Sequence, residues 1–134
     1  MTLGSRYLNT DLYLISVEDP TPLIRALETR ADVLFFTHEA DGKWYATIEA
    51  DGSGEPDSEP RRDIDSLIAA LDSLDADCAA ILAACERREM NVGWQAAAER
   101  PEGSFALEPT ALAAMTRHGM IFAVTVYPSS EADL

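Results

Sequence analysis

The chain is poor in basic residues, and this shortage excludes whole classes of partner. Lysine and arginine together number 10 among 134 residues, against 24 aspartates and glutamates, for a formal net charge of −14. Such a surface repels phosphate groups, which argues against nucleic acids and anionic membranes as partners. A basic protein partner is compatible with the charge, and so is a role for the charge in solubility alone.

Cysteine and histidine are also scarce, with two of each. Cys78 and Cys85 lie seven residues apart in a stretch with helical periodicity, where a rise of about 1.5 Å per residue separates them by roughly 10 Å. This is too far for a disulfide, so we expect both to be buried apolar residues. His118 is expected in the last turn of a helix, where it suits the helix dipole, and His38 at the end of a strand. No metal or cofactor is expected.

Long apolar runs and catalytic signatures are missing as well. No run approaches the roughly 20 apolar residues that span a bilayer, and the first residues lack the apolar core of a signal peptide. We therefore expect a cytoplasmic protein. The sequence contains no nucleophile elbow, phosphate-binding loop, dinucleotide fingerprint or zinc-ligand spacing. An enzymatic function is the less favoured interpretation.

The clearest pattern in the chain is a strand, a helix and a strand between residues 105 and 127. Pro109 stands where the first helical turn tolerates proline, and Gly119 where a left-handed residue ends the helix. The alternating run that follows, up to Tyr127, predicts a long strand with Phe122 and Val124 buried. A short strand is expected before the helix, beginning at Phe105.

The rest of the chain also alternates between strand and helix patterns. We expect four further strands, at residues 7–17, 33–38, 43–50 and 90–98. Asp41-Gly42 predicts a hairpin turn between the second and third of them, and residues 51–62 a surface loop. A helix is expected after the first strand. From Asp63 to residue 88 the pattern fits either one bent helix or two.

These elements predict an α+β fold in a single domain of residues 1–134, with loose tails at 1–6 and 129–134. Four helical segments and five or six strands favour a two-layer sandwich. In it the helices lie on one face of a mainly antiparallel sheet, which includes two strand–helix–strand units. Leu12 and Leu71 are expected in the core.

The other face of such a sheet is uncovered and is the candidate binding surface. Strand alternation is expected to gather polar and aromatic residues there, namely Asn9, Asp11, Tyr13, Tyr45, Asn91, Gln95 and Tyr127, with Thr47, Glu49 and Thr125 as neighbours. Arg88 is expected near Asn91, able to pair with Asp11 or with a ligand carboxylate. The alternative is that this face is the ordinary solvated side of a one-sided sheet.

Three short segments of the chain resemble a known family. They are Leu8-Asn9-Thr10-Asp11-Leu12, Cys85-Glu86-Arg87-Arg88-Glu89-Met90-Asn91-Val92-Gly93 and Thr125-Val126-Tyr127-Pro128. They are similar to the Leu-Asn-Thr-Asp-Leu, Cys-x-x-Arg-Glu-Phe-Asn-Ile-Gly and Thr-Leu-Tyr-Pro stretches of an uncharacterised bacterial family of small domain-of-unknown-function proteins. The chain departs from that pattern at Met90, where an aromatic residue is usual, and at Ile81-Leu82, where a tryptophan is frequent. The resemblance implies a shared fold and carries no activity.

Two functions follow from these features. The favoured one is a non-enzymatic interaction module, which forms a homodimer through the open sheet face or binds another protein. Apolar and aromatic side chains expected on that face support it, because monomers seldom expose a large apolar patch. The alternative is a small-molecule binder or enzyme that uses Asp11, Arg88 and Asn91.

Overall fold

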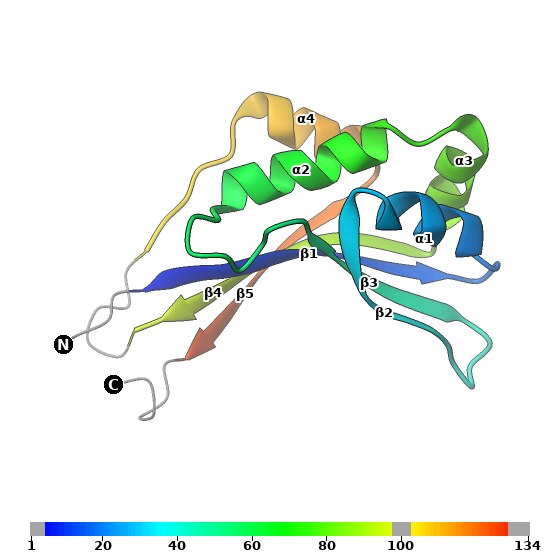
Figure 1. Cartoon of the computed structure of the whole chain (residues 1–134), viewed down its shortest axis with the longest axis horizontal. Coiled ribbons are helices and arrows are strands. Elements are labelled where there is room, and N and C mark those ends of the chain that lie inside the picture. The colour runs from blue at the N-terminus through cyan, green and yellow to red at the C-terminus, as the bar shows by residue number, and fades with distance from the viewer. Residues whose placement is uncertain (1–4, 98–102, 129–134) are drawn as a thin grey trace.

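The sheet has five strands and is arranged around the first of them. The computed structural model describes residues 5–97 and 103–128. Its strands are β1 (Arg6–Ser16), β2 (Ala31–His38), β3 (Trp44–Ala50), β4 (Arg87–Ala96) and β5 (Ile121–Pro128). Their spatial order is β2-β3-β1-β4-β5, and all neighbours are antiparallel except β4 and β5, which are parallel (Figure 1).

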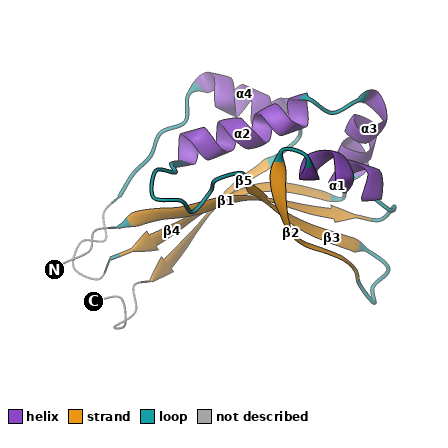
Figure 2. Ribbon diagram, in the orientation of Figure 1, coloured by secondary structure: helices purple, strands orange, loops and turns teal. Residues whose placement is uncertain are grey.

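Four helices cover one face of this sheet. They are α1 (Thr21–Glu28), α2 (Pro60–Asp72), α3 (Ala76–Ala84) and α4 (Pro109–Arg117). The two ends of the sheet bend away from the helices, so the uncovered face is the concave one (Figure 2). The expected α+β sandwich is confirmed. None of the helices in the described part of the chain is long and apolar enough to cross a membrane.

Local sequence signals set the helix ends. Pro60 and Pro109 occupy first-turn positions, where a missing N–H removes no helical hydrogen bond. Gly119 follows α4 with φ +67°, a conformation that glycine adopts without a Cβ penalty. The side chain of Asp75 accepts a hydrogen bond of 2.8 Å from the Cys78 N–H and caps α3. Residues 63–88 therefore hold two helices rather than one bent helix.

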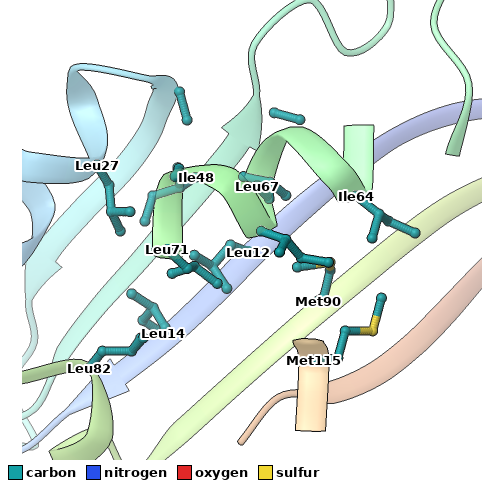
Figure 3. Packing of buried hydrophobic residues seen from close by; sticks show 14 of the residues in the cluster. Leu12, Leu14, Leu27, Ile48, Ile64, Leu67, Leu71, Leu82, Met90 and Met115 are labelled. Carbon is teal, nitrogen blue, oxygen red and sulfur yellow. The ribbon is translucent and has the colours of Figure 1, made fainter. Parts of the chain in front are cut away.

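The core lies between α2 and the middle three strands. Leu12, Ile48 and Met90 come from adjacent strands and are fully buried. Ile64, Leu67 and Leu71 of α2 pack over them, as Figure 3 shows. The expected burial of Leu12 and Leu71 is confirmed, as is that of the two cysteines, which are free.

β5 departs from the sequence-based expectation. Phe122 and Val124 are 36% and 45% exposed, although both were expected to be buried. Their orientation is as expected, because they lie opposite the buried Met90 and Val92 on β4. They are exposed because β5 is the last strand of the sheet and has a neighbour on one side only.

Two smaller expectations also need correction. Residues 103–107 form no strand, so the described sheet has five strands. Instead this segment crosses over the helix side of β4 and β5, where the Phe105 ring lies 5.8 Å from that of Trp94 and 6.3 Å from that of Phe122. Of the expected tails, residues 1–4 and 129–134 lie outside the described residues. Arg6 belongs to β1, and Ser5 directly precedes that strand.

Candidate functional site

Strand alternation places a polar row across the middle of the uncovered face. Asp11 on β1 lies directly opposite Glu49 on β3 and Asn91 on β4. Asp32 on β2 lies on the far side of Glu49. The neighbours of Asp11 along β1, Thr10 and Leu12, are fully buried on the helix side. Three carboxylates and an amide therefore stand side by side on four adjacent strands.

Asp11 is the most unusual member of this row because it is nearly buried on the face that no helix covers. The residue is 8% exposed. Its Oδ2 accepts hydrogen bonds from the Tyr13 hydroxyl at 3.4 Å and from Asn9 Nδ2 at 3.5 Å. Its Oδ1 is buried and has no hydrogen-bond partner among the described residues. A buried carboxyl oxygen without a partner carries an unfavourable desolvation energy.

The surroundings of Asp11 change its acidity. Burial raises the pKa of Asp11 to about 6, and the nearby Glu49 carboxylate adds to the rise. Burial likewise raises the pKa of the Tyr13 hydroxyl to about 12, with the charge of Asp11 contributing. A carboxyl group with a pKa near 6 can take up and release a proton close to neutral pH, which is the range useful for acid–base chemistry.

Neighbouring polar side chains connect the strands around Asp11. Asn9 Nδ2 also donates to Glu49 Oε2 at 3.1 Å and so connects β1 to β3. Asn91 Nδ2 donates to Thr125 Oγ1 at 2.9 Å and connects β4 to β5. Gly93 lies opposite Asn9, and a Cβ added there would come within 2.5 Å of the Asn9 amide oxygen. Glycine at this position therefore leaves the space that the Asn9 side chain occupies.

A hollow of about 380 Å³ lies on the same face, on the other side of Tyr13. Its side-chain lining is mainly apolar and aromatic and includes Ile15, Phe35 and Tyr45. Arg87 and Glu89 line it as well, and Arg87 NH2 donates to Glu89 Oε1 at 2.5 Å. Phe35 was not among the candidates. The register of β2 shifts between Val33 and Phe35, so a regular two-residue alternation does not give the face on which Phe35 lies.

The expectation that Arg88 faces Asp11 is wrong. Its guanidinium lies on the helix side, where NH1 donates to the carbonyl oxygens of Leu82 at 3.1 Å and Ala83 at 2.5 Å. Its Nε donates to the Gly119 carbonyl oxygen at 3.2 Å. Arg88 precedes Asn91 by three positions, and an odd spacing along a strand puts two side chains on opposite faces. The alternation of side chains along the strand therefore predicts that Arg88 and Asn91 lie on opposite faces.

The remaining candidates lie on the uncovered face but away from Asp11. Gln95 and Tyr127 are neighbours on β4 and β5, four residues beyond Asn91 along β4. The Tyr45 hydroxyl donates to Asp41 in the turn between β2 and β3. The candidates thus divide into a central polar group (Asn9, Asp11, Tyr13 and Asn91) and three residues nearer the ends of the sheet.

The histidines and acidic residues form no metal centre in the part of the chain that the structure describes. His118 ends α4, and its Nε2 lies 2.7 Å from Asp72 Oδ1 on α2. Arg117 NH2 donates to the same oxygen at 2.7 Å. These contacts lower the pKa of Asp72, with the Arg117 hydrogen bond as the larger cause. The pair joins two helices and lies on the opposite side of the sheet from Asp11.

Comparison with protein-family models, curated proteins and solved structures finds no match for this chain, so the family resemblance of its three short segments stays a prediction.

Proposed function

We propose that the chain is a non-enzymatic interaction module that forms a homodimer at β5, the open edge of its sheet, rather than through the uncovered face as a whole. One observation carries the proposal. β5 leaves five large apolar side chains between 36% and 59% exposed, namely Ile121, Phe122, Val124, Val126 and Tyr127. Phe122, Val124 and Val126 lie on the helix side and Ile121 and Tyr127 on the uncovered face, so the exposed apolar side chains follow the edge of the sheet on both faces. Exposed apolar surface that gathers along one element usually marks an interface.

The distribution of charge supports a second copy as the occupant. Each chain has a net charge of −14, so two copies repel each other over most of their surfaces. β5 contains no charged residue from Ile121 to Pro128. Ile121 and Tyr127 carry this uncharged surface onto the uncovered face, opposite Glu89 and Gln95 of β4. Two copies therefore meet with the least repulsion at β5.

Light scattering at micromolar concentration in moderate salt tests the proposal. We expect twice the chain mass for the wild type and the chain mass for Val126→Lys, because a lysine in the contact leaves a charge without a partner. Leu34→Lys is the matched control, since Leu34 is 55% exposed on the opposite edge strand, β2. It should remain a dimer. A wild-type monomer would contradict the proposal and favour a foreign partner, such as a basic protein, for the same surface.

A small-molecule binder or enzyme centred on Asp11 is the second candidate. The unpartnered Oδ1 and the raised pKa of Asp11 favour it, because perturbed carboxyl groups cluster at functional sites. We expect small amines or guanidines to raise the melting temperature of the wild type but not that of Asp11→Asn. Equal responses of the two proteins across such a screen would exclude Asp11 as the binding group.

A further inference from the structure

The two edges of the sheet differ in how they are protected against pairing with another chain. On β2, the register with β3 shifts between Val33 and Phe35, which indicates a bulge. That strand also carries Asp32 and His38. Bulges and charged side chains are the usual means by which proteins block the edge of a sheet.

β5 has none of these protections. It pairs with β4 from Ile121 to Pro128 without a shift in register, and it carries no charge. No other described strand lies beside it. The outward N–H and C=O groups of an apolar edge strand without a bulge are a template for a further strand. The chain thus blocks one edge and leaves the other ready to pair.

The residues of β5 are complementary to those of a second β5 in antiparallel orientation. With a two-fold axis through Val124, Phe122 of one copy lies opposite Val126 of the other, and Ile121 opposite Tyr127. Ala123 then faces Thr125. Because this two-fold axis is perpendicular to the sheet, the helices of both copies lie on the same side of the joined sheet. A side chain on the helix side of one copy therefore meets a side chain on the helix side of the other. Pairs between aromatic and β-branched residues are among the stabilising cross-strand pairs.

A hollow on the helix side fits this register. It measures about 340 Å³ and is lined by Trp94, Phe105, Val124 and Val126, together with two small residues. In the antiparallel pairing, the Phe122 ring of the second copy lies beside Val126, at the edge of this hollow. Each copy then supplies one aromatic ring and one apolar recess. Buried aromatic anchors in recesses contribute most of the energy in many interfaces.

We infer that two copies of the chain pair edge to edge, β5 against β5 about Val124, and so join their two five-stranded sheets into one continuous sheet. This inference rests on the proposed homodimer and specifies how it is built. Among the described residues of the uncovered face, the acidic residue nearest to β5 is Glu89, which lies opposite Ile121 on β4 and is paired with Arg87. The residues of β5 that meet in this pairing, Ile121 to Tyr127, are all neutral.

Disulfide cross-linking tests the register. In an antiparallel pair, opposed Cα atoms lie about 4.5–5.5 Å apart, within the range that a disulfide spans. Val124→Cys should therefore give a covalent dimer under mild oxidation. Val126→Cys is the control on the same face, because its two copies lie four residues apart along the strands, roughly 13 Å. We expect Val124→Cys to cross-link at least about tenfold faster than Val126→Cys.

A mixture of Phe122→Cys and Val126→Cys adds a second measurement. Neither variant should cross-link to itself, whereas the mixture should give a covalent heterodimer. The wild type is the negative control and should not cross-link, since Cys78 and Cys85 are both buried. A dimeric mass with no preference for Val124→Cys would overturn the edge pairing and leave the homodimer intact. A monomeric mass for the wild type would overturn both.

Discussion

Replacing Asp63 by alanine should lower the free energy of unfolding by about 2–4 kcal/mol. Asp63 is fully buried in the first turn of α2, and its Oδ2 accepts a hydrogen bond of 2.5 Å from the Tyr7 hydroxyl on β1. Its Oδ1 accepts two more from the Arg62 guanidinium, at 3.2 and 3.3 Å. Burial, together with the hydrogen bond to Asp63, raises the pKa of Tyr7, so the hydroxyl stays a donor. Alanine would leave that donor without its carboxylate.

Urea unfolding followed by circular dichroism would measure this loss. Asp65→Ala is the matched control, since Asp65 lies two residues further along α2 and is exposed, with Arg61 at 4.0 Å. It should cost less than about 1 kcal/mol, as is usual for exposed ion pairs. Asp63→Asn, which keeps an acceptor for Tyr7, should fall between the two. Equal costs for Asp63→Ala and Asp65→Ala would show that the buried carboxylate does not hold α2 on β1.

Replacing Asp11 by asparagine should stabilise the fold at pH 8 by up to about 3 kcal/mol and change it little at pH 4. The pKa of Asp11 is about 6 in the folded chain, against about 3.9 in an unfolded one. Between these two values the folded state keeps a proton that the unfolded state has released. The contribution of the protonated Asp11 to the free energy of unfolding is therefore fully present below about pH 4, and it is lost as the pH rises through 6. Asparagine is neutral throughout and removes this dependence.

Unfolding curves at several pH values between 4 and 8 would show the effect as a difference between the two proteins that grows with pH. Asp32→Asn is the control, because Asp32 belongs to the same cross-strand row but is exposed. Its effect should stay within about 0.5 kcal/mol at every pH. A constant difference between wild type and Asp11→Asn would mean that Asp11 does not keep its proton in the fold. If Asp11 destabilises the fold at neutral pH, its presence fits a functional role, because functional residues often lower stability.

The sequence predicted on which face of the sheet a side chain lies better than it predicted which strands are neighbours. Asn9, Asp11 and Tyr13 lie on the uncovered face as expected, because the buried Thr10, Leu12 and Leu14 set the phase of β1. An apolar alternation looks the same in a central strand and in an edge strand. It therefore gave the orientation of Phe122 correctly and its burial wrongly.

The properties of Asp11 could not be predicted for a related reason. Its raised pKa depends partly on Glu49, which lies 38 positions further along the chain and is brought opposite it by the register of β1 and β3. A two-residue periodicity contains no information about that register. The error over Arg88 is of another kind, because the odd spacing from Asn91 was visible in the sequence.

The central place of β1 also has a consequence for the time course of synthesis. Leu12 pairs with Ile48 on one side of the strand and with Met90 on the other. A ribosome that adds about 5–20 residues per second delivers Met90 roughly 4–16 s after Leu12. During that interval the β1–β3–β2 part of the sheet can form, while the second edge of β1 waits for β4. Pairings between such distant segments slow folding, so a newly made chain exposes an apolar inner strand for seconds before its own β4 covers it.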